Sequence, residues 1–316
     1  MHLEGSLAPE TLWALAQRQG FPFGLRDLDA CRQLYTFNSF DGFIHAIKTA
    51  SQLLLRPDDY AIAVRALARG LQAQGVLYSE VFLSIGILLW RNVAVEPYWE
   101  AIEPARLQAE KETGVTLRWI FDAVRQFGPE PFQRVVDWAV KLHESKTVLG
   151  IGIGGDERQR SAAEFAPGYA RARLAGLKTT VHAGETCGAD SIWDALNWLK
   201  PDRIGHGLRA FEDARLLDEL ISRQTILDIC PTSNLKTGAW PSGLPHPAYK
   251  YYMRGIKIAV SSDDPGIFGC SLLDEYCWLA AHGGFSFDQL TQLATASLDD
   301  CQASPRRMRV EMDGCE

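Results

Sequence analysis

Residues 178–185 read Lys-Thr-Thr-Val-His-Ala-Gly-Glu, a short run of β-branched residues that ends in polar side chains. Threonine and valine favour strands, and a glycine directly after such a run indicates a turn. The same arrangement recurs at residues 203–207, which read Arg-Ile-Gly-His-Gly, and at residues 261–265, which read Ser-Ser-Asp-Asp-Pro. A fold that gathers the ends of several strands at one face would bring these polar residues together.

Outward from this stretch, short apolar runs alternate with longer segments of helical spacing. We predict strands over 75–82, 115–121, 148–153, 178–182, 203–206, 225–229 and 257–261, with His2 and Leu3 as a very short additional strand. The predicted helices include 97–111, 131–143, 161–175, 191–199 and 213–223. Eight strand–helix units without a Pro- or Gly-rich linker predict one (β/α)8 TIM-type barrel domain over residues 1–316.

The segment 21–60 is too long for a single crossover and carries Tyr35, Phe37, Phe40 and Phe43 near two helical patterns. We therefore expect a helical insertion after the first strand. Two interpretations remain open for it. It is either a lid over the barrel face or an ordinary helical pair packed on the rim.

The composition limits the classes of partner. The chain has 316 residues, 47% of them hydrophobic, and a formal net charge of −7 without a long run of either sign. Nucleic-acid and anionic-membrane binders usually carry a basic face, so we expect a small-molecule substrate instead. No stretch is apolar enough to span a bilayer, and the start lacks the features of a signal peptide. Seven scattered cysteines without a Cys-x-x-Cys pair argue against a disulfide framework, so we expect a cytoplasmic protein.

In a barrel, active residues lie at the carboxyl ends of the strands. A single histidine at such a position is more often a hydrogen-bonded core residue than a ligand. Two histidines, a glutamate and an aspartate pair at one face are harder to explain by packing alone. The candidates at the strand ends are His2, Glu4, His182, Glu185, His206, Asp263 and Asp264.

Imidazole and carboxylate groups are usual ligands of zinc, and a catalytic zinc keeps one coordination position open for water. His2, His182 and Asp263 are suited to converge on one such ion. The ion would lower the pKa of its water from ~15.7 toward ~7 and so supply hydroxide at neutral pH. The sequence therefore predicts one zinc ion per chain.

Glu185 lies three residues after His182 and is suited to transfer a proton between the attacking water and a ring nitrogen. His206 is suited to orient the hydroxide and stabilise charge in the transition state. Asp263 and Asp264 also admit a structural interpretation, because aspartate before Pro265 is a good helix N-cap. The glycines at 150–155 lie inside and after a strand, so they do not form a dinucleotide-binding fingerprint.

Taken together, these strings resemble the adenosine deaminase family of the amidohydrolase superfamily. They occur in the family's order from residue 2 to about residue 300, and six in order are far more specific than any one. The strings are His2-Leu3-Glu4-Gly5-Ser6, Gly154-Gly155-Asp156-Glu157, His182-Ala183-Gly184-Glu185, Arg203-Ile204-Gly205-His206-Gly207, Cys230-Pro231-Thr232-Ser233-Asn234 and Ser262-Asp263-Asp264-Pro265.

The resemblance implies a function for each matching residue. His2, His182 and Asp263 would bind zinc. Glu185 would protonate ring N1 of the purine, and His206 would position the water at the metal. The implied reaction is attack of hydroxide at C6, formation of a tetrahedral intermediate and loss of ammonia.

The resemblance also implies how the substrate is held. Asp264 would hydrogen-bond the purine at N7, and the backbone N–H of Gly155 would donate to N3. Glu4 would contact a sugar hydroxyl. The implied substrate is an adenine-type purine nucleoside, with adenosine the leading candidate.

Two departures from the family's pattern keep alternatives open. The family begins with His-x-His, and with His2 as the second histidine the first would fall one residue before Met1. We expect a start codon assigned too late or a truncated chain; the alternative is a degenerate homologue that binds a nucleoside without turnover. The glycine-rich residues 152–157 and the turn Ser84-Ile85-Gly86 are also atypical of adenosine-specific members. They leave 6-amino-6-deoxyfutalosine and adenine as alternative substrates.

A hydrolase of the phosphotriesterase or dihydroorotase type is a further alternative on the same scaffold. Such enzymes use two metals bridged by a carboxylated lysine at the fourth strand. The corresponding stretch here is glycine-rich and has no lysine, which favours a single metal.

Overall fold

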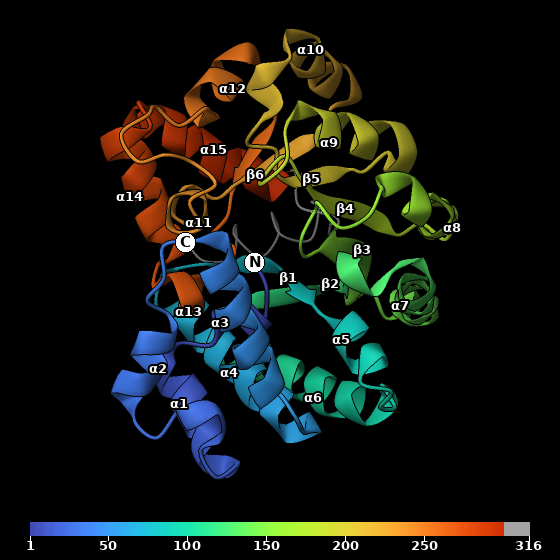
Figure 1. The fold of residues 1–316 in the computed structure, drawn as a ribbon, viewed down its shortest axis with the longest axis vertical. Coiled ribbons are helices and arrows are strands. Elements are labelled where there is room, and N and C mark those ends of the chain that lie inside the picture. Colours follow the sequence, from blue (N-terminus) through green and yellow to red (C-terminus); the bar gives the residue numbers. More distant parts are fainter. Residues whose placement is uncertain (300–316) are drawn as a thin grey trace. The chain divides into compact units, whose positions relative to one another are not determined.

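The computed structural model describes residues 1–299 (Figure 1). Within it the chain divides into two compact units. The first unit comprises Met1–Leu117, Cys230–Leu244 and Ser261–Glu275. The second unit comprises Arg118–Ile229, Pro245–Val260 and residues 276–299. The prediction of one domain over residues 1–316 stays a prediction.

Strands β2 to β7 lie in chain order in a parallel sheet, in which each strand is hydrogen-bonded to its neighbours in the sequence. The register places His182 opposite Gly205 and Ala183 opposite His206. Each strand predicted from a β-branched run is present, with ends shifted by a few residues at most. The strands are β1 (Tyr78–Leu83), β2 (Thr116–Val124), β3 (Val148–Gly154), β4 (Lys178–Ala183), β5 (Arg203–His206), β6 (Ile226–Ile229) and β7 (Ile258–Val260).

The predicted strand at His2 and Leu3 is a single parallel bridge between His2 and Phe82. The Phe82 N–H donates to the carbonyl of Met1 at 2.8 Å, and the Leu3 N–H donates to the carbonyl of Phe82 at 2.9 Å. On its other side, the His2 N–H donates to the carbonyl of Asp263 at 2.8 Å. Extended pairing stops there because the chain turns into the 3₁₀ helix Glu4–Ser6, where the Ser6 hydroxyl donates to the Leu3 carbonyl.

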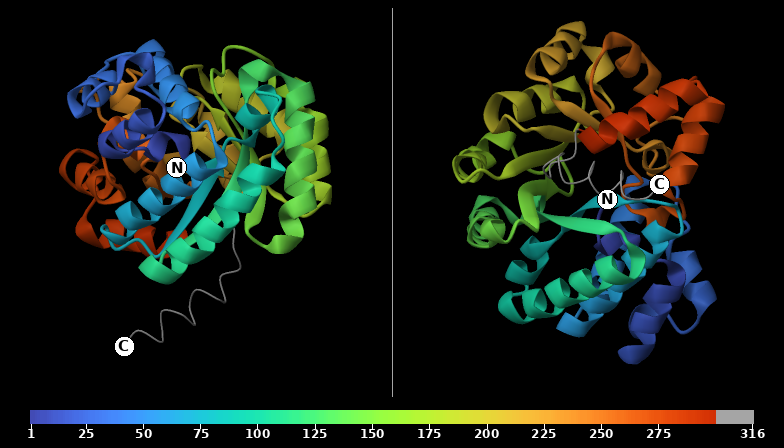
Figure 2. Two further views of the ribbon diagram at one scale, coloured as in Figure 1. Left: turned by 90° about the horizontal axis from the view of Figure 1, so that it is seen from below. Right: turned by 180° about the vertical axis from the view of Figure 1, so that it is seen from behind.

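In the first unit, the insertion predicted over 21–60 contains helices α2 and α3. The Tyr35 hydroxyl at the end of α2 donates to the Leu7 carbonyl at 2.9 Å, and Phe43 of α3 stacks on Phe268 of α13. Helices α4 and α6 pack side by side (Figures 1 and 2). The helices are α1 (Pro9–Arg18), α2 (Leu28–Leu34), α3 (Phe40–Leu53), α4 (Pro57–Gln72), α5 (Ile85–Trp90), α6 (Glu96–Thr113), α11 (Pro231–Lys236) and α13 (Pro265–Phe268).

In the second unit, helices follow the strands as predicted. The helix predicted over 161–175 begins as a 3₁₀ turn, Ala162–Phe165, where Ser161 and Glu164 form a capping box. The one predicted over 191–199 ends as a π-helical turn, Ala195–Leu199. The helices are α7 (Pro129–Leu142), α8 (Ala166–Leu174), α9 (Ala189–Asp194), α10 (Ala214–Arg223), α12 (Ala248–Arg254) and α15 (Phe287–Asp299), and α14 (Leu272–His282) begins in the first unit.

No helix among residues 1–299 combines the length and apolar character that crossing a membrane requires. The five cysteines in this described range, Cys31, Cys187, Cys230, Cys270 and Cys277, are free thiols. Cys301 and Cys315 lie outside the described residues.

The core of the second unit depends on aromatic packing between α7, α8 and the sheet. Phe132 is fully buried and lies 5.6 Å from Phe165 and 5.4 Å from Tyr169, measured between ring centroids. The buried hydroxyl of Tyr169 donates to the carbonyl of Thr180 in β4 at 2.5 Å. This contact ties α8 to the strand that carries His182.

We expect Phe132→Ala to lower the free energy of unfolding by about 3–5 kcal/mol, because it leaves a cavity beneath α8. Phe287→Ala is the matched control, since Phe287 is 83% exposed and its removal should change stability by less than about 0.5 kcal/mol. Urea unfolding of both variants measures the difference. Equal stability of the two variants would contradict this account of the core.

Candidate active site

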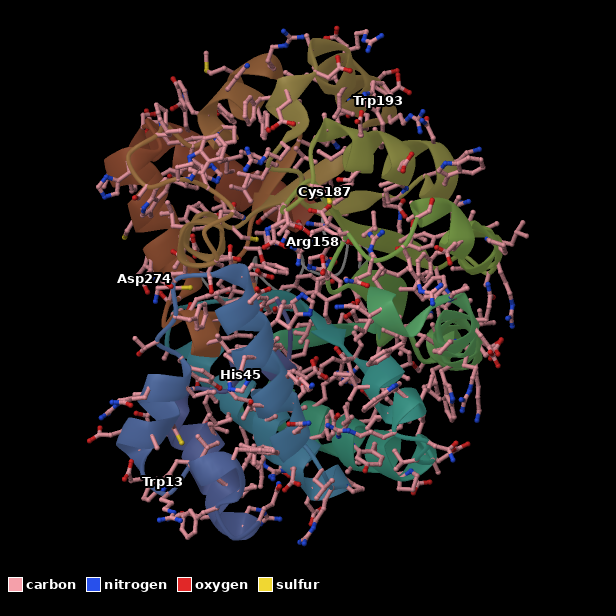
Figure 3. The ribbon with its side chains drawn as sticks, in the orientation of Figure 1. Trp13, His45, Arg158, Cys187, Trp193 and Asp274 are labelled. Carbon is pink, nitrogen blue, oxygen red and sulfur yellow. The ribbon has the colours of Figure 1, made fainter. Side chains whose placement is uncertain are left out.

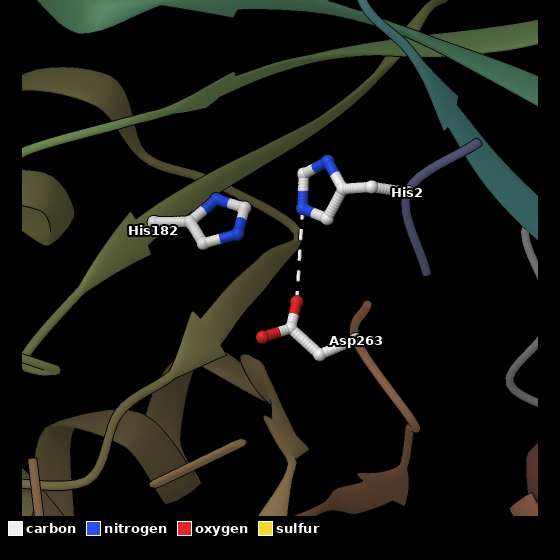
Figure 4. A group of neighbouring side chains, drawn as sticks. All are labelled: His2, His182 and Asp263. Carbon is white, nitrogen blue, oxygen red and sulfur yellow. Dashed lines mark ion pairs between the residues drawn. The ribbon is translucent and has the colours of Figure 1, made fainter. Parts of the chain in front are cut away.

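In the first unit, His2 and Asp263 face each other (Figure 4). His2 Nε2 lies 3.7 Å from Asp263 Oδ1, and the imidazole stacks on Phe82 with ring centroids 4.5 Å apart. A separation of 3.7 Å is too long for a hydrogen bond. It is close to the ~3.4 Å between two atoms that each lie ~2.1 Å from a shared tetrahedral ion. The pair therefore has the spacing of two metal ligands.

The backbone at Asp263 is held in the left-handed region, with φ at 57°. Residues other than glycine adopt this conformation at a cost, and it often marks a functional position. The Ser233 hydroxyl donates to Asp263 Oδ2 at 2.8 Å, and both side chains are buried. The conformation and the hydrogen bond together fix the direction of the carboxylate.

Asp264 is the residue before α13, with Pro265 in the first helical turn. Its side chain is buried and makes no capping hydrogen bond to that helix. The N-cap interpretation of the aspartate pair therefore holds for the position of Asp264 but not for its carboxylate. A Cβ atom on Gly5 would lie 1.6 Å from Asp264 Oδ1, so the carboxylate occupies the space that this glycine leaves.

Glu4 is buried in the first unit, 2% exposed. The Ser84 N–H donates to its Oε1 at 3.0 Å, while its Oε2 has no hydrogen-bond partner within residues 1–299. Burial raises the pKa of Glu4 to about 7, against the opposing effect of backbone hydrogen bonds. An unpaired buried oxygen beside the strand end is a vacant position for a polar group of a ligand.

In the second unit, His182 is held from both sides. Its Nδ1 lies 3.1 Å from the carbonyl of Ile153, which can only accept, so Nδ1 carries the proton and Nε2 is available as a ligand atom. The buried Arg125 donates to the His182 carbonyl at 3.0 Å. A Cβ atom on Gly205 would lie 3.3 Å from the imidazole, so glycine gives His182 its room.

Glu185 and His206 form a second pair in this unit. His206 Nε2 lies 3.7 Å from Glu185 Oε2, and the rings of His206 and His182 lie 5.4 Å apart. Both members of the pair are buried. His206 has φ at 65°, a second strand-end residue in the left-handed region. The pair brings together a carboxylate and an imidazole, two groups that commonly act as general acids and bases in enzymes.

Gly155 follows β3 with φ at 92°, and a Cβ there would lie 2.3 Å from Gln126 Oε1. Glycine is therefore required at the position predicted to donate its backbone N–H. The next residue, Asp156, forms an ion pair with Arg158, which is labelled in Figure 3. The carboxylate of the following residue, Glu157, accepts hydrogen bonds from the loop after β4.

The structure adds three residues that the sequence interpretation missed. Ser233 and Glu157 lie inside two of the strings that resemble the family, and this is the signal that could have found them, but nothing in the neighbouring sequence indicates their partners. Arg125 lies in no such string, and only the fold brings it to the His182 carbonyl.

Comparison with known proteins now gives the family. The model of the family described as adenosine deaminase matches residues 1–310. An aminodeoxyfutalosine deaminase from Streptomyces avermitilis is 34% identical over 277 residues, which cover 87% of this chain and 77% of that protein.

Solved structures of related enzymes also match this chain over nearly its whole length. An adenine deaminase from Arthrobacter aurescens is 30% identical, with a TM-score of 0.90 over 99% of this chain and 95% of that one. An amidohydrolase from Burkholderia ambifaria with bound zinc is 26% identical, with a TM-score of 0.87 over 98% and 87%. The predicted (β/α)8 TIM-type fold with a helical insertion after the first strand is confirmed.

We expect Gly5→Ala to lower the free energy of unfolding by ~1–3 kcal/mol, because the new methyl overlaps Asp264. Gly70→Ala is the matched control, since Gly70 lies in α4 with no atom within 4 Å of its Cβ position. That change should raise stability by roughly 0.5–1 kcal/mol. Thermal or urea unfolding compares them, and stabilisation by both changes would contradict the packing described for Asp264.

Proposed function

This chain belongs to the adenosine deaminase family, and we propose that it is a zinc-dependent aminohydrolase of an adenine-type nucleoside. That it is a hydrolytic deaminase of the purine type follows from the family and from relatives named as adenine and aminodeoxyfutalosine deaminases. The zinc ion, the nucleoside and the residue roles are the proposal. The reaction replaces the 6-amino group with oxygen: water adds at C6, and the C6–N bond breaks to release ammonia.

The observation that carries the proposal is the spacing and orientation of the candidate ligand atoms. His2 Nε2 lies 3.7 Å from Asp263 Oδ1, the spacing of two ligands of one ion, and His182 directs its Nδ1 proton to the carbonyl of Ile153. We propose that His2, His182 and Asp263 hold one zinc ion; the zinc-bound structure of a relative supports this choice of metal. When bound, zinc supplies Lewis acidity that lowers the pKa of water toward ~7.

Glu185 and His206 move and hold protons in this proposal. Glu185 delivers a proton to purine N1 as water adds to the neighbouring C6, and a proton then passes to the departing amine. His206, 3.7 Å from Glu185, orients the attacking water and stabilises the negative charge that develops on its oxygen. The burial of both residues strengthens these interactions.

Three further residues hold the substrate. Asp264 contacts the purine at N7, and the Gly155 N–H donates to N3. Glu4 contacts a sugar hydroxyl through the oxygen that has no partner within residues 1–299. The vacant acceptor on Glu4 is the feature that favours a nucleoside over a free base.

Adenosine is the first candidate substrate. A second is 6-amino-6-deoxyfutalosine, because the 34% identical relative from Streptomyces avermitilis is named for it. The departures at 152–157 and at Ser84-Ile85-Gly86 point in the same direction. Free adenine, for which other relatives are named, lacks the sugar that Glu4 would contact.

We expect the purified, zinc-supplied protein to release ammonia from an adenine nucleoside, with loss of absorbance at the adenine band. Adenosine, 6-amino-6-deoxyfutalosine and adenine are assayed in parallel at equal concentration. Turnover of a nucleoside above that of adenine is the expected result. Turnover of adenine alone would overturn the proposal that the substrate is a nucleoside. Inactivity toward all three compounds with zinc bound would overturn the proposal that the substrate is an adenine-type purine.

The matched control for this assay is Glu185→Gln. It keeps the size of the side chain but cannot transfer the proton, so turnover should fall to a trace that only a high enzyme concentration detects, while zinc stays bound. Full turnover by this variant would remove Glu185 from the reaction.

A further inference from the structure

One buried carboxylate in the second unit accepts hydrogen bonds from several residues of a single loop. Glu157, three residues beyond the end of β3, is 8% exposed. Its Oε2 accepts from the Gly184 N–H at 2.8 Å and the Ser191 hydroxyl at 3.0 Å. Its Oε1 accepts from the Cys187 N–H at 2.6 Å and from both the N–H and the hydroxyl of Thr186. All of these donors belong to the connection between β4 and α9 or to the first turns of α9.

Glu185 lies in the middle of this loop. The residue before it, Gly184, and the residue after it, Thr186, both donate backbone N–H groups to Glu157. The next residue, Cys187, which Figure 3 labels, does so too. A chain held on both sides of one residue leaves that residue little freedom in φ and ψ. The Glu185 side chain is therefore directed by contacts that its own carboxylate does not make.

The charge of Glu157 suits this arrangement. Burial by itself would raise the pKa of the carboxyl, but the N–H donors of Cys187, Gly184 and Thr186 outweigh it and hold the pKa below its usual value. An ionised carboxylate accepts through both oxygens, and hydrogen bonds to a charged acceptor are the strong ones. A neutral glutamine, which has the same size, has only one acceptor oxygen and could not accept from the N–H groups of both Gly184 and Cys187 through separate oxygens.

We propose that Glu157 is the positioning residue of Glu185: it fixes the loop 184–187 so that the Glu185 carboxylate faces His206. This inference rests on the proposed function, because it assigns Glu157 a purpose in the proton transfer by Glu185. Glu157 does not itself touch the reacting atoms. It acts through the backbone on either side of the residue that does.

A simpler role, holding the start of α9, belongs to another carboxylate. Glu212 Oε2 accepts from the Ala189 N–H at 3.1 Å, at the first residue of that helix. Glu212 makes none of the bonds described above to residues 184, 186 and 187. Glu212→Gln is therefore the matched control, since it changes a carboxylate at the same helix without releasing the loop.

The test is a double-mutant cycle on the zinc-loaded full chain, with Glu157→Gln, Glu185→Gln, the double variant and Glu212→Gln. In Glu157→Gln an amide NH₂ replaces one acceptor oxygen and faces an N–H donor of the loop. We expect kcat to fall roughly 10- to 100-fold with KM little changed, as for a misplaced catalytic group. Glu212→Gln should keep wild-type kcat. In the Glu185→Gln background, measured at high enzyme concentration, Glu157→Gln should add no further loss.

Amide hydrogen exchange over peptides that contain residues 184–187 gives a readout without turnover. Protection of these amides should drop in Glu157→Gln and stay intact in Glu212→Gln, with equal zinc content in all variants. Hydrogen exchange therefore tests the positioning role of Glu157 separately from the proposed function. If the wild-type chain is inactive on every substrate, the proposed function is overturned, but exchange still shows whether Glu157 holds the loop.

Two results would overturn the positioning role. One is wild-type kcat or unchanged exchange in Glu157→Gln. The other is a loss from Glu157→Gln that is equally large with and without the Glu185 carboxylate. If Glu157→Gln does not fold, Thr186→Val removes only the hydroxyl donor at 3.1 Å and should lower kcat with KM unchanged. An unchanged kcat in that variant would then count against the role.

Discussion

The backbone hydrogen bond from the His2 N–H to the Asp263 carbonyl is the contact on which the arrangement of His2 and Asp263 in the first unit depends. Together with the two bonds between Met1–Leu3 and Phe82, it holds a segment of three residues between two other parts of the chain. Once this segment is paired, His2 faces Asp263 and the next turn buries Glu4 beside Ser84.

The second constraint is backbone conformation at the ends of the strands. His206 and Asp263 both have positive φ, which costs free energy in residues that carry a side chain. The surrounding contacts keep them there: Ser233 bonds the Asp263 carboxylate, and Tyr251 donates to the Gly207 and Leu208 carbonyls just after His206. Groups fixed in this way need not reorganise during a reaction, and such preorganisation is a large part of enzymatic rate enhancement.

The sequence predicted the strands well because each is a β-branched run that glycine or polar residues end, a signal confined to a few neighbouring residues. It predicted polar candidates at the strand ends because the carboxyl ends of barrel strands share one face, and their roles in one site stay a prediction. It did not predict the partners of Glu157, 27 to 34 residues away, or of Arg125, 57 residues from His182. Those contacts depend on the tertiary fold. The sequence predicts an ordinary helix where the structure has the π-helical turn Ala195–Leu199, because α- and π-helices have nearly the same spacing of apolar residues.

We propose that a single zinc ion is held by two imidazoles and one carboxylate, and X-ray absorption at the zinc edge of the purified protein measures this coordination. We expect one zinc per chain with only nitrogen and oxygen neighbours at ~2.0–2.2 Å, two of them imidazole. A sulfur neighbour at ~2.3 Å would mean a cysteine ligand, and a second metal at ~3.5–4 Å would mean a two-metal site. Either result would contradict the assignment of His2, His182 and Asp263.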